Sequence, residues 1–191
     1  MAFKYQHLLV LIVFGLFLIA TLSLAEKSFV ELLPSPNFTP NPTVAGVAKT
    51  SLCQSVNGLP DTVCTPGAID PNVTQDNIKT TICVSGYTQT VRPSTTYTNN
   101  LKRQQISEYG FTDTNLGSYE EDHLISLELG GSPKDPKNLW PEAYDGVWGA
   151  RAKDKVENYL HEAVCNGIIT LNEAQKAIST DWTQIYKKIT P

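Results

Sequence analysis

Histidine, closely paired cysteines and excess positive charge are all scarce in this sequence. Only three histidines occur, His7, His123 and His161, and His7 falls in a segment that is expected to be removed. The four cysteines include no C-x-x-C pair, which argues against a zinc knuckle. The formal net charge is −4, so the overall field does not attract polyanions. Nucleic-acid binding would therefore need a local basic patch, a bound cation, or both.

The first 25 residues have the pattern of a secretory signal peptide. Lys4 precedes an uncharged apolar run, and Ser23-Leu24-Ala25 supplies the small residues that predict cleavage before Glu26. Without cleavage, the same stretch would act as an N-terminal membrane anchor. In both cases the rest of the chain is expected to be exported, to a secreted or periplasmic location. After cleavage we expect no stable membrane partner.

The cysteines are expected to form disulfides, as is usual in an oxidising compartment. Four cysteines allow three pairings. We favour Cys53–Cys64, which closes a local loop, and Cys83–Cys165, a long-range link across the main domain.

Beyond the signal peptide, the composition divides the chain in two. Residues 26–76 are rich in proline, serine and threonine and predict an arm or linker, whereas residues 77–191 are expected to form the folded domain. Residues 78–91 suggest short strands or an extended arm. Three helices are predicted by periodicity and end signals, over residues 95–109, over residues 148–166, and from Thr170 with its capping-box partner Glu173.

The segment between the first two of these helices predicts a β-hairpin. From Asp122 to Leu129, apolar and polar residues alternate, which predicts a half-buried strand that ends at Gly130-Gly131. A loop over residues 132–137 leads to a second strand, which starts at Asn138. The predicted fold class is therefore α+β, with a small hairpin plus helix at its centre and additional helices around it.

This segment resembles the HNH nuclease superfamily through Asp122-His123, Gly130-Gly131 and Asn138-Leu139. In that superfamily a β-hairpin and a helix form a ββα-metal site. The similarity covers roughly residues 118–160. The wider sequence also resembles small exported bacterial proteins with this motif, and it does so through Thr90-Val-Arg-Pro93, Leu101-Lys102, Lys153-Asp154 and the Trp182 helix.

The resemblance implies a metal-dependent endonuclease that hydrolyses phosphodiester bonds in DNA or RNA. Such an enzyme would contact its nucleic-acid substrate through backbone phosphates, with little sequence specificity. Asp122 would bind a divalent metal ion, Mg²⁺ or alternatively Mn²⁺. His123 would be the general base, and Asn138 would bridge the hairpin and orient the histidine. These roles suit the chemistry, because a neutral imidazole can take a proton from water and a hard cation can stabilise the leaving oxygen.

The predicted helix lacks the further histidine or asparagine that the superfamily places there. A helical wheel centred on Val156 puts Lys153 and Glu157 beside the buried face. We therefore expect Glu157 to be a second metal ligand and Lys153 to join the catalytic set by binding phosphate. The simpler alternative is a solvated ion pair between these two residues.

Four further basic residues are candidate phosphate contacts. Arg92, Lys102 and Arg103 form the densest basic group before the motif. Arg151 lies on the predicted helix, and the helical wheel directs it away from the hairpin. Two other functions remain open at this stage: a secreted interaction or structural module without catalysis, and an exported protein that holds a cation for stability alone.

Overall fold

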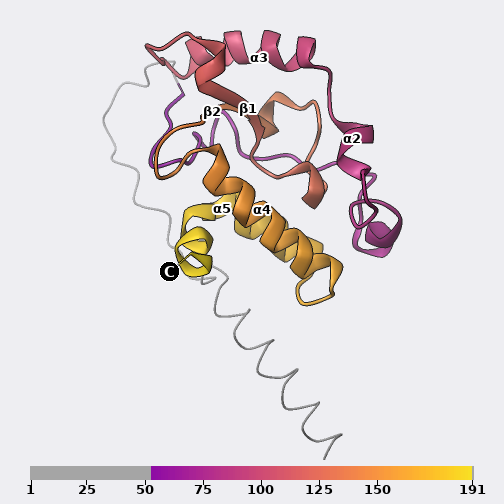
Figure 1. Ribbon diagram of the computed structural model, residues 1–191. Coiled ribbons are helices and arrows are strands. Elements are labelled where there is room, and N and C mark those ends of the chain that lie inside the picture. The colour runs from indigo at the N-terminus through magenta and orange to yellow at the C-terminus, as the bar shows by residue number, and fades with distance from the viewer. Residues whose placement is uncertain (1–52, 191) are drawn as a thin grey trace, which may run out of the picture. The chain divides into compact units, whose positions relative to one another are not determined.

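The computed structural model describes residues 53–190. The predicted signal peptide and residues 26–52 of the predicted arm lie outside this range. The described part combines helices with a two-stranded antiparallel hairpin (Figure 1), which confirms the α+β class. Its α-helices and strands are α2 (Tyr87–Val91), α3 (Thr95–Glu108), β1 (Tyr119–His123), β2 (Leu139–Ala143), α4 (Ala150–Cys165) and α5 (Leu171–Ile189). Short 3-10 helices cover Gln75–Thr80, Leu116–Ser118, Leu127–Leu129 and Pro136–Asn138.

The hairpin lies between α3 on one side and the α4–α5 pair on the other (Figure 1). In its register Glu120 is opposite Glu142, and His123 is opposite Leu139. The core forms where the end of the hairpin meets the two long helices. Its fully buried apolar side chains include Leu129, Leu139, Val156, Leu160, Ile178 and Trp182.

The three predicted helices are confirmed, with ends that differ by one or two residues. The capping box that starts α5 is present, because the Thr170 hydroxyl accepts from the Glu173 backbone and the Glu173 carboxylate accepts from Thr170. The helix α5 has a break at Asp181, where the dihedrals are non-helical, and this break was not predicted. The Asp181 carboxylate accepts a hydrogen bond from the Thr183 backbone at 3.1 Å, so it caps the second half of the helix.

The expectation of strands over residues 78–91 is wrong. The chain forms a 3-10 helix and then the single-turn helix α2, which follows Gly86 at a φ of 82° and ends before Arg92-Pro93. The β-branched residues favour strands only when a neighbouring strand is available, and this segment pairs with none of the described strands.

The first strand is also shorter than predicted. Regular pairing ends at His123, and the next residues turn into a 3-10 helix capped by Ser126. The side chain of Asn138 satisfies both the N–H and the C=O of Ile125, so these groups do not continue the ladder. The backbone at Gly131 passes so close to Ile125 that a Cβ at Gly131 would lie 1.7 Å from the Ile125 carbonyl oxygen. Only glycine fits at that position.

Residues 53–76, which the sequence assigned to the arm, pack against the domain. Ile69 forms a bridge with Gly131, and the Asp70 N–H donates to the Gly130 carbonyl at 2.8 Å. The indole N–H of Trp182 donates to the Gly58 carbonyl at 3.0 Å. The boundary predicted at residue 77 therefore falls inside a continuous packed region.

Both favoured disulfides, Cys53–Cys64 and Cys83–Cys165, are confirmed. They fit an extracellular or periplasmic location. No helix within residues 53–190 is long and apolar enough to cross a membrane.

Candidate functional site

His123 is the last residue of β1, and only 5% of its surface is exposed. Its Nε2 atom lies 3.1 Å from the carbonyl oxygen of Pro133. Because a carbonyl can only accept, this hydrogen bond requires the proton on Nε2 and leaves Nδ1 as the acceptor of the neutral ring. Burial lowers the pKa of His123 below its usual value, against the opposing effect of Asp122. The imidazole is thus neutral at neutral pH and held in one tautomer.

Lys153 on α4 reaches the hairpin as predicted, and its ammonium is almost completely buried. It donates to the His123 carbonyl oxygen at 2.8 Å and lies 2.7 Å from Asp122 Oδ2. It also donates to Glu157, one helical turn later. Burial favours a neutral amine, but the neighbouring carboxylates outweigh it and raise the pKa of Lys153 above its usual value. The pair of Lys153 and Glu157 is therefore part of the buried site and not a solvated surface pair.

Asp122 and Glu157 are the two carboxylates in direct contact with this ammonium. Burial alone would raise the pKa of Asp122, yet the charge of Lys153 holds it below its usual value. Glu157 also accepts a hydrogen bond from the Ser126 hydroxyl at 3.0 Å, which links α4 to the turn after β1. Burial raises the pKa of Glu157.

Glu142 lies on the same face of the hairpin as Asp122 and was not among the predicted site residues. It is 1% exposed, and its carboxyl group is hydrogen-bonded to Asp122, which requires a proton on one of the two carboxyls. Burial, together with the charge of Asp122, raises its pKa well above the usual value. The cross-strand register could have revealed it, because Glu142 faces Glu120, which shares a strand face with Asp122.

Two more glutamates lie within electrostatic range of this cluster. Burial raises the pKa of Glu120 to about 7, with smaller contributions from Asp122 and others. Burial likewise raises the pKa of Glu128 to about 7, followed by the charge of Glu157. Arg92 acts on both groups and on His123 from the end of α2. Of the four basic residues predicted to contact phosphate, Arg92 is the one whose charge affects the pKa of His123.

Asn138 is fully buried and joins the two ends of the turn. Its Oδ1 accepts from the Ile125 N–H at 2.9 Å, and its Nδ2 donates to the carbonyls of Ile125 and Ser132 at 3.0 and 3.1 Å. Its backbone carbonyl accepts from the Leu124 N–H, next to His123. These contacts bridge the hairpin, so Asn138 acts as a positioning residue that has no surface for substrate.

Lys102 does not suit its predicted role as a phosphate contact. It is buried, and its ammonium donates to the carbonyls of Leu116 and Tyr119. Those bonds tie α3 to the start of β1 and leave the charge inaccessible. Arg103 is exposed on α3 but is hydrogen-bonded to Asn100. Arg151 lies with its guanidinium 5.9 Å from the ring centre of Tyr144, outside the buried cluster.

The donor set suits a hard divalent cation. Asp122, Glu157 and the carbonyl oxygen of His123 all contact the Lys153 ammonium, and oxygen donors of this kind are the ones that Mg²⁺ and Mn²⁺ prefer. Within residues 53–190, however, the carboxylates of this site do not form a group of three ligands as close together as the cysteine–histidine group described below. A cation bound beside Glu142 would displace the proton that Glu142 and Asp122 share. The Lys153 ammonium already contacts two of these carboxylates, so a divalent cation would compete with it.

Cys83, His161 and Cys165 form a second group with metal-ligand geometry, with donor atoms within 4.8 Å of one another. Because the two cysteines are joined in a disulfide, they offer no thiolate ligands in this state. His161 lies beside the disulfide, with Nε2 3.3 Å from Cys165 Sγ. This group could hold a metal only after reduction.

No family model, curated protein or solved structure matches the chain. The interpretation of the site therefore depends on its own residues and geometry.

Proposed function

We propose that this protein is an exported, metal-dependent endonuclease of the HNH type. It hydrolyses phosphodiester bonds in DNA or RNA and contacts its substrate through backbone phosphates, with little sequence preference. The observation that carries the proposal is the neutral, tautomer-fixed His123 at the end of a hairpin strand, adjacent to Asp122 and to the carboxylates around Lys153.

His123 is the general base. With its Nε2 proton committed to the Pro133 carbonyl, Nδ1 takes the proton from the attacking water. The resulting imidazolium is stabilised by the neighbouring Asp122 charge. The bond to Pro133 also fixes the ring plane, which reduces the cost of orienting the base.

Asp122, Glu142 and Glu157 would hold the divalent ion, Mg²⁺ or Mn²⁺. When bound, such an ion stabilises the negative charge that develops on the phosphate and leaving oxygens. Lys153 holds the strand end through the His123 carbonyl and balances the buried carboxylates. Arg92, which is exposed near Glu120 and His123, supplies a phosphate contact at the entrance.

Cleavage of plasmid and single-stranded DNA by the purified protein tests this proposal. We expect degradation with Mg²⁺ or Mn²⁺, loss of degradation with EDTA, and loss in His123→Ala. His161→Ala is the matched control, because it removes the other histidine of the described domain and should retain activity. Equal activity in His123→Ala and the unaltered protein would refute the proposal. No cleavage with either ion, alongside unchanged stability in His123→Ala, would favour a non-catalytic secreted module instead.

A further inference from the structure

A group of basic and aromatic side chains covers the surface where α4 begins and α5 ends. Five residues connect the two helices (166–170), so they run antiparallel and bring these ends together (Figure 1). Each of three exposed cations lies over one of three half-buried aromatic rings. The pairs are Arg151 over Tyr144 at 5.9 Å, Lys155 over Tyr186 at 5.6 Å and Lys187 over Trp148 at 5.2 Å from the ring centre. We call these six residues the cation–aromatic patch.

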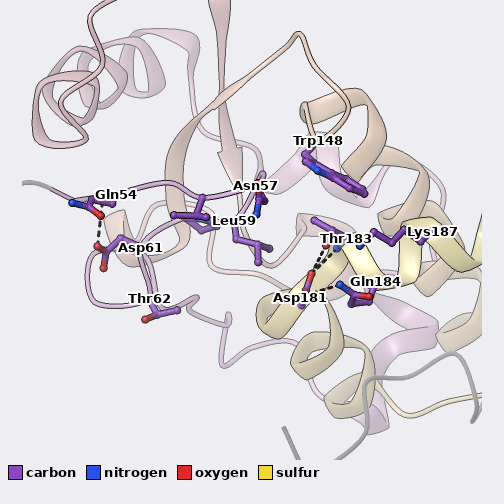
Figure 2. A pocket seen from close by; sticks show the side chains of 12 residues that line it. Gln54, Asn57, Leu59, Asp61, Thr62, Trp148, Asp181, Thr183, Gln184 and Lys187 are labelled. Atoms are coloured by element: carbon purple, nitrogen blue, oxygen red, sulfur yellow. Dashed lines mark hydrogen bonds between the residues drawn. The ribbon is translucent and has the colours of Figure 1, made fainter. Parts of the chain in front are cut away.

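A polar pocket of about 600 Å³ opens beside this patch. Trp148 and Lys187 line it from the helical side, and Asn57, Leu59 and Thr62 line it from the N-terminal segment (Figure 2). Asp181, Thr183 and Gln184 of α5 also face the pocket. The pocket thus combines an aromatic wall with amide and hydroxyl groups, which can pair with the edges of a nucleobase.

The patch is directly connected to the candidate site. Tyr144 follows the last residue of β2, and its N–H donates to the Ser118 carbonyl next to the start of β1. Arg151 precedes Lys153 by two residues on α4. A polymer that crosses the patch therefore approaches the hairpin that carries Asp122 and His123.

The charges of the patch oppose those of the rest of the chain. The whole sequence has a net charge of −4, whereas three of the six patch residues are cations. The nearby carboxylates of Glu120 and Asp154 lie within electrostatic range of Tyr144. Two acidic groups line the pocket, and both are hydrogen-bonded: Asp181 accepts from Thr183 and Gln184, and Asp61 accepts from the backbone N–H groups of Gln54, Val63 and Cys64. A local basic surface of this kind is what a nucleic-acid-binding protein with an acidic overall balance requires.

We propose that the patch and its pocket bind single-stranded nucleic acid, and that they deliver it to the hydrolytic site. Arg151, Lys155 and Lys187 take the phosphates, and a base stacks against Trp148 in the pocket. This inference deepens the proposed nuclease function and depends on it for its biological meaning. Single strands are favoured because their bases are free to stack on exposed rings, whereas the bases of a duplex are already stacked on each other.

Fluorescence anisotropy with a fluorescein-labelled single-stranded oligonucleotide tests the proposal. EDTA in the buffer prevents cation-dependent cleavage, so that binding is measured alone. Arg151→Gln/Lys155→Gln/Lys187→Gln should bind at least about tenfold more weakly at low salt. The slope of log affinity against log salt should fall by about 2, because each lost phosphate contact removes about 0.7 for a single strand. A duplex of the same sequence should bind the unaltered protein about tenfold more weakly than the single strand.

The matched control is Lys79→Gln/Lys137→Gln/Lys176→Gln, which removes three exposed cations that lie outside the patch. It should keep the affinity and the salt slope of the unaltered protein. An equal loss in both triple variants, or no loss in the patch variant, would overturn the proposal. Equal binding of single strand and duplex would also overturn it. Binding through the patch without any cleavage in Mg²⁺ would refute the nuclease function but leave the binding surface intact. Cleavage at an unchanged rate in the patch variant would refute the role of the patch but leave the nuclease function intact.

Discussion

The Lys153 ammonium donates a hydrogen bond to the backbone carbonyl of His123, 30 residues earlier, at 2.8 Å. This contact joins the helix of the proposed site to the strand that carries its base. The same ammonium forms ion pairs with both Asp122 and Glu157. One buried cation thus fixes the position of His123 and lowers the free-energy cost of burying the surrounding carboxylates.

Replacement of Lys153 by methionine should strongly destabilise the fold. The change leaves the Asp122 and Glu157 carboxylates buried without their counter-charge, which typically costs about 3–5 kcal/mol. Urea unfolding at pH 7 measures the loss. Lys176→Met, an exposed lysine on α5, should change stability by less than about 0.5 kcal/mol. Addition of Asp122→Asn and Glu157→Gln to Lys153→Met should restore much of the loss, and a triple variant as unstable as the single one would contradict this account.

The pH dependence of cleavage should reflect the lowered pKa of His123. The base works only when it is neutral, and burial moves its protonation to lower pH than the usual value of 6.5. Initial rates with saturating Mg²⁺ should therefore stay near their maximum as the pH falls to 6.5 and decline below it. The stability of the folded protein should change with pH in the same direction as the rate. The contribution of neutral His123 to stability is present above pH 6.5 and is lost as the pH falls through the folded pKa. An acidic midpoint above 6.5 would contradict a buried histidine base.

Glu121 should make the protein less stable as the pH rises. It is 7% exposed, neither of its carboxylate oxygens has a hydrogen-bond partner among residues 53–190, and burial raises its pKa to about 8. Between pH 4.5 and 8 the unfolded chain loses this proton while the folded protein retains it, so the stabilisation present at low pH is progressively lost. Glu121→Gln should exceed the unaltered protein in stability by about 1–3 kcal/mol at pH 8 and match it near pH 4.5.

Urea unfolding at the two pH values checks this expectation. Glu162→Gln, an exposed position on α4, should show no such divergence. A Glu121→Gln protein that is less stable than the parent at pH 8 would indicate that the carboxylate has a stabilising partner.

Loss of the Asn138 side chain should open the turn that follows His123. Asn138→Ala leaves the Ile125 N–H and two carbonyls without partners in a buried region, which should cost about 2–4 kcal/mol. Thermal or urea unfolding measures the change. Asn158→Ala, on the exposed face of α4, should cost less than about 1 kcal/mol. Similar losses in the two variants would show that the Asn138 bridge contributes little.

The local parts of the site could be predicted from the sequence. The helical period alone was sufficient to direct Lys153 and Glu157 toward the hairpin, and the Asn138 bridge followed from the family resemblance. Glu142 was missed because its position depends on the strand register, which the turn between the strands sets. Lys102 was misjudged because its burial depends on how α3 lies against β1. Both are consequences of long-range packing, which local pattern does not encode.

The Cys83–Cys165 disulfide closes a covalent ring that contains every residue of the proposed site, from Arg92 to Glu157. A protease that cuts once inside this ring leaves the two fragments attached to each other. The nicked protein would migrate as a single chain until a reductant is added. The two parts of the proposed site would therefore stay together in one molecule after a first cleavage.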